Sequence, residues 1–444
     1  HPWITFKDPS NVRYSLQHEG VVHSSNLCTE ILEHTKASKY ENGEKTEVGE
    51  TAVCNLGSIN LANHVEDAEV NWDKLAATVS TAIRMLDNVI DLNFYPTAEA
   101  KNSNMKHRFI GMGTMGWQDL YYELGVNYDS DAAVTLADKV MEFISYHAIK
   151  TSSELAKERG TFETYEGSSW SKNTFPIDTY RHLMDTRGEG NAHVIGKAQE
   201  TLDWTPVRAH VKEHGMRNAL TMAVAPTATI SFVAGCSQSI EPDFGVIYVY
   251  STMSGEFTMV NRHFVKDMKR LGLWDEDMVA LIKHVDGDLS LLDDDIVPQA
   301  VKNKYKTAFH LDQKKLIECA AARQKWIDQG QSLNLYNNQT SLKTLHEIYI
   351  HAWKTGLKTT YYLRNESASR VEKSTINKSQ IERIISEKKS EMPSVISGPE
   401  KQKDPATTQV ESGETAEEES APVANETESL TRVDTVNIAC VGCQ

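Results

Sequence analysis

The stretch Ser25-Asn26-Leu27-Cys28-Thr29-Glu30-Ile31 lies near the start of this 444-residue chain and places a thiol between an amide and a carboxylate. If the stretch is extended, alternate side chains share a face, so Asn26, Cys28 and Glu30 form a row with steps of about 7 Å. Such a row can hold a thiol between a hydrogen-bonding amide and a base. A buried structural cysteine between solvent-facing polar residues is the alternative, and this stretch alone leaves both interpretations open.

Two adjacent tyrosines, in Tyr361-Tyr362-Leu363-Arg364, lie far downstream. Neighbouring phenols can pass an electron and a proton between them. Together with Cys28 they indicate radical chemistry at a cysteine, with the radical supplied from outside the chain. A pair of core aromatic residues is the alternative.

Two further motifs are associated with short apolar runs that favour buried strands. Cys54 lies in Ala52-Val53-Cys54, where a cysteine often serves only as a small hydrophobic residue. Ala225-Pro226-Thr227-Ala228-Thr229-Ile230-Ser231 follows the strand predicted over 220–224, and proline with small hydroxyl residues is typical of a helix start. The N–H groups of such a start attract phosphate, with ordinary helix capping as the alternative.

A glycine pattern, Gly111-Met112-Gly113-Thr114-Met115-Gly116, matches the dinucleotide-binding sequence G-x-G-x-x-G. The residues before it, 102–108, are polar instead of forming a buried strand. Because the βαβ context is missing, we do not predict a dinucleotide site here.

Apolar residues at helical spacing predict helices over 72–92, 131–159 and 311–329, and the last is followed by the apolar run 332–335. Helices that alternate with short apolar strands favour an α/β architecture in which both faces of the sheet are covered.

The composition, with 40% hydrophobic and 24% charged residues, is that of a soluble globular protein. No apolar run approaches the roughly 20 residues of a membrane helix, and no signal peptide is recognisable. The net charge of −16, without a basic patch, argues against nucleic-acid binding. Six cysteines in such a chain predict reduced thiols and a cytoplasmic location. Because His1 stands where a starting Met is expected, we interpret the chain as a fragment or a processed product.

The sequence changes character after Arg370, since residues 371–444 contain no aromatic side chain. We expect residues 1–370 to form the folded portion, 371–392 a helical or fraying connector, 393–435 a flexible acidic linker and 436–444 a tail carrying Cys440 and Cys443. A thiol pair on a flexible tether suits redox exchange. Half of a zinc site is the alternative, but the tail offers neither a second pair nor a histidine.

Taken in this order, the motifs around Cys28, Cys54, Pro226 and Tyr361, with the terminal cysteine pair, resemble the large (alpha) catalytic subunit of class I ribonucleotide reductase. The segment 108–113 looks like a family segment as well. The resemblance covers the whole chain and implies a ten-stranded α/β barrel with a central finger loop that carries the radical cysteine. This chain would form the C-terminal part of that barrel and end in a disordered tail.

The resemblance also implies a role for each motif. Cys28 would become the thiyl radical, Glu30 would take the 3′-hydroxyl proton of the ribose and Asn26 would orient the substrate. Cys54 would be one of two reducing thiols, and Tyr361 and Tyr362 would relay the radical. The terminal thiols would reduce the resulting disulfide and then be reduced by thioredoxin or glutaredoxin. The substrate, a ribonucleoside diphosphate, would contact the residues Ser25, Asn26, Leu27, Cys28, Thr29, Glu30, Pro226, Thr227, Ala228, Thr229 and Ile230.

The same resemblance defines the expected partners. The thiol partner of Cys54 and the nucleotide-sensing domain lie upstream in the family, so we expect a complementary N-terminal fragment. A small subunit would generate the radical at a di-iron or similar metal cofactor, and we predict no metal or other cofactor in this chain. The large subunit would form a homodimer.

Two alternatives remain. An adenosylcobalamin-dependent (class II) reductase shares the finger-loop cysteine and the cysteine tail, but a cofactor within the same chain would not need the Tyr361–Tyr362 relay. An inactive scaffold that binds the small subunit would have no need of the motif residues, all of which are present.

Overall fold

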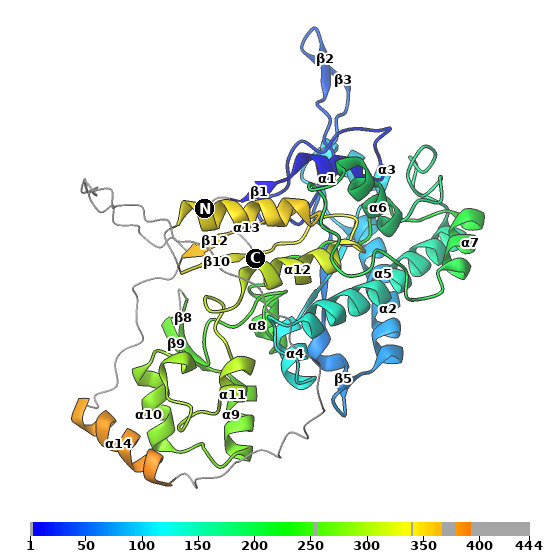
Figure 1. Ribbon diagram of the computed structural model, residues 1–444. Coiled ribbons are helices and arrows are strands. Elements are labelled where there is room, and N and C mark those ends of the chain that lie inside the picture. The colour runs from blue at the N-terminus through cyan, green and yellow to red at the C-terminus, as the bar shows by residue number, and fades with distance from the viewer. Residues whose placement is uncertain (1–2, 253–254, 339–340, 366–377, 392–444) are drawn as a thin grey trace, which may run out of the picture.

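The computed structural model describes residues 3–252, 255–338, 341–365 and 378–391 (Figure 1). At its centre four parallel segments lie side by side. Strand β4 (Leu56–Asn60) pairs with β7 (Gly111–Met115), β7 is bridged to Met222, and Val224 is bridged to Gln331. No closed sheet occurs among the described residues. The protein is thus a mixed helix-and-strand structure, as the alternating pattern predicted.

Three long helices pack beside these segments. Helices α2 (Trp72–Leu92) and α5 (Asp131–Arg159) begin and end where the apolar spacing predicted. The side chains of Asn71 and Ser130 cap them by accepting hydrogen bonds from backbone N–H groups of the first turn. Helix α5 lies between α2 and α12, as Figure 1 shows.

Helix α12 (Gln313–Gln324) is shorter at both ends than the predicted 311–329. Asp312 caps its start by accepting a hydrogen bond from Lys314 N. Its end is set by the sheet, because Gln329 N donates to Met222 O and Ser332 N donates to Val224 O. The apolar spacing continues past Gln324, but residues 329–332 form the fourth parallel segment and cannot belong to the helix.

The other elements surround this centre or extend from it. Strand β1 pairs antiparallel with β11, β10 pairs parallel with β12, and β2–β3, β5–β6 and β8–β9 are hairpins. The bounds of the strands are β1 (Ile4–Thr5), β2 (Lys39–Glu41), β3 (Glu44–Glu47), β5 (Val65–Glu66), β6 (Glu69–Val70), β8 (Ile247–Thr252), β9 (Gly255–Val260), β10 (Leu335–Asn337), β11 (Thr359–Thr360) and β12 (Leu363–Asn365). Those of the helices are α1 (Lys7–Val12), α3 (Ala98–His107), α4 (Trp117–Glu123), α6 (Pro176–Arg187), α7 (Thr205–His214), α8 (Ile230–Ala234), α9 (Arg262–Arg270), α10 (Glu276–His284), α11 (Gln299–Lys304), α13 (Leu342–Lys354) and α14 (Lys378–Glu391), with 3-10 turns at Leu61–His64 and Leu289–Leu291.

A second, smaller core lies among α9, α10, α11 and α14. Ile381 and Ile384 of α14 are buried in it, and Lys388 forms a 2.6 Å ion pair with Asp275 at the start of α10. Helix α14 occupies most of the expected connector. The expected linker 393–435 and the tail with Cys440 and Cys443 lie outside the described residues.

One predicted strand is wrong. Residues 52–54 do not form a strand, and β4 begins only at Leu56. The chain before Cys54 is held instead by an antiparallel bridge between Lys36 and Glu50 and by a hydrogen bond from Val53 N to the Glu33 carboxylate. Its apolar residues are only partly buried and Cys54 is exposed, because nothing described covers this edge.

The glycine-rich stretch forms the buried strand β7. At Gly113 an added Cβ would lie 2.4 Å from the carbonyl oxygen of Ala223, so the neighbouring segment leaves no room for a side chain. The glycine here serves strand packing, which agrees with our decision not to predict a dinucleotide site.

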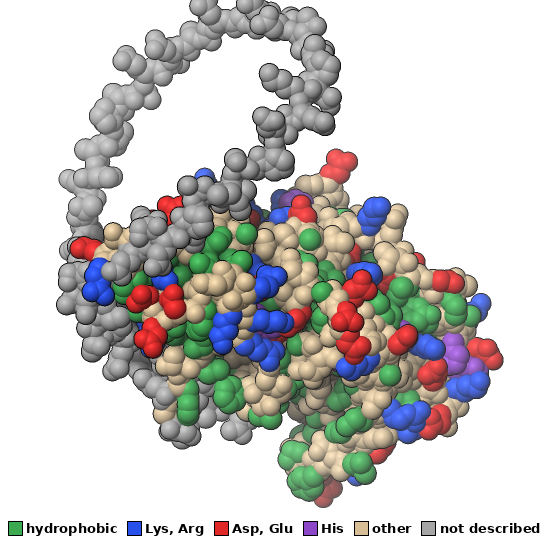
Figure 2. Space-filling model, turned by 90° about the horizontal axis from the view of Figure 1, so that it is seen from below, with side chains coloured by type: hydrophobic (Ala, Val, Ile, Leu, Met, Phe, Trp, Pro, Cys, Tyr) green, Lys and Arg blue, Asp and Glu red, His purple; other side chains and the backbone are tan. Residues whose placement is uncertain are grey.

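The surface carries both signs of charge. On the face seen in Figure 2, acidic and basic side chains lie near one another instead of forming separate fields. Within the described residues, no helix is long and apolar enough to cross a membrane.

Candidate active site

The segment around Cys28 is a turn, not the extended strand that the alternating pattern suggested. Thr29 N donates to Asn26 O at 3.1 Å, and Thr29 has a positive φ of 71°. The side-chain oxygen of Asn26 accepts a hydrogen bond from Ile31 N at 3.1 Å. The predicted row of Asn26, Cys28 and Glu30 on one face of a strand is therefore wrong. The turn nevertheless keeps these three residues together and buries Cys28 and Glu30.

The fourth parallel segment holds this turn in place. Gly330 N donates to Glu30 O at 2.8 Å, and the side chain of Gln329 accepts from Leu32 N at 3.1 Å. The Ser332 hydroxyl lies within hydrogen-bonding distance of Cys28 O and 3.1 Å from the Glu30 carboxylate. A Cβ at Gly330 would approach the Thr29 carbonyl oxygen to 2.5 Å, so only glycine fits beneath the turn.

The tyrosine pair reaches the same place. The Tyr361 hydroxyl donates to the Cys28 thiol at 3.5 Å. The ring of Tyr362 stacks on that of Tyr361, with centroids 3.8 Å apart and planes at 28°. Main-chain bonds fix both residues, since Tyr361 N donates to Leu333 O and Leu335 N donates to Tyr362 O. The asparagine next to these residues, Asn334, accepts a bond from Tyr362 N.

Burial sets the acidity of the carboxyl groups near the turn. Burial raises the pKa of Glu30, although hydrogen bonds from Asn26 and Ser332 act in the opposite direction. The pKa of Glu33 is raised to about 8 by complete burial, against a single backbone hydrogen bond from Val53. A carboxylate whose pKa is raised is a stronger base once it has lost its proton.

Cys54 lies in the electrostatic field of these two acids. Desolvation, and then the charges of Glu33 and Glu30, raise the pKa of its thiol to about 12. The thiol therefore keeps its proton at neutral pH, while the residue remains accessible to solvent. It is suited to donate hydrogen instead of attacking as a thiolate.

The loop Pro226–Ile230 follows the third parallel segment and leads into α8, as the sequence predicted. Thr227 is buried with φ of 54°, and its hydroxyl accepts from Ser239 N at 2.8 Å. Thr229 and Ile230 are exposed, whereas Pro226 and Ala228 are partly buried. The carboxyl end of a parallel segment is where open α/β sheets bind ligands.

The remaining predicted contacts lie at the rim of the turn. The Ser25 hydroxyl is 2.9 Å from that of Thr5, and Leu27 is exposed. Gln329, Gly330 and Ser332 were not predicted as part of the site. The apolar run 332–335 was the only sequence feature noted in this segment. Nothing in its local pattern indicates that the segment supports the Cys28 turn, which lies far upstream in the chain.

Comparisons with known proteins show the family to which this chain belongs. Residues 1–363 match the family model for the ribonucleotide reductase barrel domain. The chain is 51% identical over 377 residues to the alpha subunit of ribonucleoside-diphosphate reductase of Chlamydia trachomatis, which covers 85% of this chain and 35% of that protein. The large chain 2 of Saccharomyces cerevisiae is 37% identical, and the alpha subunit of Helicobacter pylori is 36% identical, each over 85% of this chain.

The chain spans between about a third and a half of the length of these curated relatives. Its match to the family model nevertheless includes the Cys28 turn, Cys54, the loop before α8 and the tyrosine pair. This chain belongs to the ribonucleotide reductase barrel-domain family.

Proposed function

We propose that this chain is the C-terminal catalytic part of the large subunit of a class I ribonucleoside-diphosphate reductase, which converts ribonucleoside diphosphates to deoxyribonucleoside diphosphates for DNA precursor synthesis. The observation that carries the proposal is the contact between the Tyr361 hydroxyl and the Cys28 thiol, with Tyr362 stacked behind it.

The first step is radical transfer. A small partner subunit, with a di-iron or similar cofactor, supplies the oxidising equivalent, and Tyr362 passes it to Tyr361. The Tyr361 phenoxyl radical then takes the hydrogen atom of the Cys28 thiol along the 3.5 Å contact. The O–H bond re-forms as the S–H bond breaks, so the proton and the electron move together and leave a thiyl radical.

The second step takes place at the ribose. The thiyl radical removes the 3′ hydrogen, and the deprotonated Glu30 accepts the 3′-hydroxyl proton, which eases departure of the 2′-hydroxyl as water. Asn26 orients the sugar. Cys54 and a second thiol from the upstream part of the subunit deliver two hydrogens, one to the departing hydroxyl, which leaves as water, and one to C2′, and they become a disulfide. Glu30 then returns the proton to the 3′ oxygen, and Cys28 returns its hydrogen atom to C3′ and becomes the thiyl radical again.

The loop Pro226–Ile230 would hold the substrate diphosphate through its N–H groups at the start of α8. The parallel segments would form part of a ten-stranded barrel with Cys28 on its finger loop, completed by the upstream portion. Cys440 and Cys443 would reduce the disulfide in exchange with thioredoxin or glutaredoxin. We further propose a cytoplasmic location and a homodimer of the large subunit.

The test is Cys28→Ser in the large subunit, assayed with the small subunit and thioredoxin. Serine matches the size of cysteine, but its O–H bond is too strong for ready radical formation. We therefore expect no diphosphate reduction while substrate binding is nearly unchanged. Cys319→Ser in α12 is the control, because that buried thiol donates to Tyr128 O and takes no part in the proposed reaction. Substantial turnover by Cys28→Ser would refute the thiyl assignment.

A further inference from the structure

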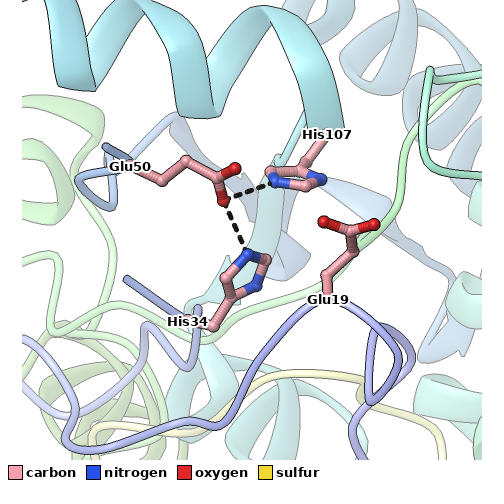
Figure 3. A group of neighbouring side chains, drawn as sticks. All are labelled: Glu19, His34, Glu50 and His107. Atoms are coloured by element: carbon pink, nitrogen blue, oxygen red, sulfur yellow. Dashed lines mark hydrogen bonds and ion pairs between the residues drawn. The ribbon is translucent and has the colours of Figure 1, made fainter. Parts of the chain in front are cut away.

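Two histidines and two glutamates, none of which the proposed reaction uses, form a cluster (Figure 3). His34 follows the Cys28 turn, Glu50 precedes Cys54, His107 ends α3, and Glu19 lies in the loop after α1. Their ligand atoms all lie within 4.8 Å of one another, and His34, Glu50 and His107 are buried. These donors come from four segments, so no local spacing marks them in the sequence.

The two imidazole rings face one carboxylate. The Nε2 atoms of His34 and His107 lie 2.7 and 2.9 Å from the same oxygen of Glu50 (Figure 3). The opposite nitrogens, Nδ1, lie 2.7 Å from the hydroxyls of Tyr14 and Thr164. Since a hydroxyl donates or accepts, each ring can carry its proton on Nδ1 and turn the Nε2 lone pair inward. Such an outer hydrogen bond is typical of metal-binding histidines.

Two lysine ammonium groups now balance the two carboxylates. Lys36 Nζ lies 2.7 Å from Glu19, and Lys106 Nζ lies 3.0 Å from Glu50 and 3.1 Å from Glu19. The side chains of Lys36 and Lys106 are 35% and 23% exposed, so both can turn toward solvent. One divalent cation carries the same charge as these two ammonium groups and would leave the buried cluster neutral.

We propose that Glu19, His34, Glu50 and His107 form a binding site for one divalent transition-metal ion, which enters by displacing the ammonium groups of Lys36 and Lys106. Two imidazole nitrogens and two carboxylate oxygens form a four-coordinate donor set that fits Zn²⁺. The bound ion would tie together the segments that carry Cys28 and Cys54 and the end of α3.

The experiment measures metal binding directly and does not depend on turnover. The full chain with Cys440→Ser and Cys443→Ser, which removes the terminal thiols as competing ligands, is dialysed against Zn²⁺ or Co²⁺. We expect one ion per chain. The Co²⁺ form should show the visible absorption of a nitrogen and oxygen site without a thiolate charge-transfer band.

Substitutions then assign the site. His107→Gln or Glu19→Gln removes a direct ligand and should weaken Zn²⁺ binding by at least the roughly 10- to 100-fold that follows loss of a hydrogen-bonded partner behind a ligand. Lys36→Met should tighten binding about fivefold, because it removes a resident competing cation. Lys39→Met is the matched control, since Lys39 pairs with Glu47 on the exposed β2–β3 hairpin and should not change the affinity.

Three results would overturn the proposal. The first is that Zn²⁺ does not bind stoichiometrically either to the chain with intact lysines or to the Lys36→Met variant. The second is that Glu19→Gln binds Zn²⁺ with undiminished affinity. The third is that the Co²⁺ form shows thiolate charge-transfer bands. Glu19 is only partly buried, so the Zn²⁺ affinity of Glu19→Gln can still be measured if His107→Gln fails to fold.

Discussion

The Tyr361 hydroxyl and the Cys28 thiol lie 3.5 Å apart although 333 residues separate them in the chain. Tyr361 is buried, and its main chain is fixed by Leu333, which belongs to the segment that also supports the Cys28 turn. One chain segment, 329–335, thus positions both ends of the proposed hydrogen-atom transfer.

Tyr361→Phe and Tyr362→Phe should each stop turnover without disturbing the fold. Phenylalanine preserves the 3.8 Å ring stacking but removes the oxidisable phenol. Diphosphate reduction with the radical-bearing small subunit is the measurement, with circular dichroism as the control for folding. Near-normal turnover by either variant would favour the alternative that the pair is only a core contact.

Gly330→Ala should reduce turnover strongly, because the new methyl group would press on the Thr29 carbonyl oxygen at 2.5 Å and displace the turn that carries Cys28. We expect a destabilisation of about 1–3 kcal/mol, typical of overpacking. Gly57→Ala in β4 is the control, since its added Cβ would meet only Leu86, at an ordinary 3.5 Å. Equal effects of the two substitutions on turnover would contradict this role of Gly330.

Glu33→Gln should flatten the pH dependence of stability. The pKa of Glu33 is about 8 in the folded protein, above the usual value of about 4.5, so the folded state keeps a proton that the unfolded state has lost. Stability therefore falls as the pH rises between about 4.5 and 8, by up to about 1.4 kcal/mol per pH unit. Glutamine stays neutral and can still accept the bond from Val53 N.

Urea unfolding at pH 5.5, 6.5 and 7.5 measures this difference. The stability of the wild-type chain should fall relative to that of Glu33→Gln at each step. If the two proteins keep a constant difference in free energy of unfolding, Glu33 does not titrate in this range.

Cys440→Ser or Cys443→Ser should block turnover driven by thioredoxin but leave much of the turnover driven by dithiothreitol. A small dithiol diffuses to the site, whereas thioredoxin depends on the tail. If residues 393–435 form the flexible linker that their composition predicts, a chain of about 40 residues would span roughly 35 Å, enough to reach from the rim of the proposed barrel to its centre. Cys54→Ser is the contrasting variant and should not be rescued by dithiothreitol. Equal loss with both reductants in the tail variants would refute the shuttle.

Several features could be predicted because residues close together in the sequence determine them. The bounds of α2 and α5 followed from apolar spacing, and the start of α8 followed from its proline and threonines. Other predictions failed where tertiary contacts outweigh local pattern. The residues 52–54 are apolar but have no strand partner among the described residues. Helix α12 ends early because the residues that follow it pair with the neighbouring parallel segment.

By itself the sequence determined which residues we propose for the chemistry, namely Asn26, Cys28, Glu30 and the tyrosine pair, since their types and order carry the family resemblance. Only the tertiary structure decided how they meet. The alternating pattern around Cys28 favours a strand, but the main-chain bond from Gly330 and the Ser332 hydroxyl hold it as a turn. The histidine and glutamate cluster was likewise invisible along the chain, because its four donors come from separate segments that only folding brings within 4.8 Å. Backbone pairing and burial act between residues far apart in sequence, and local spacing does not encode them.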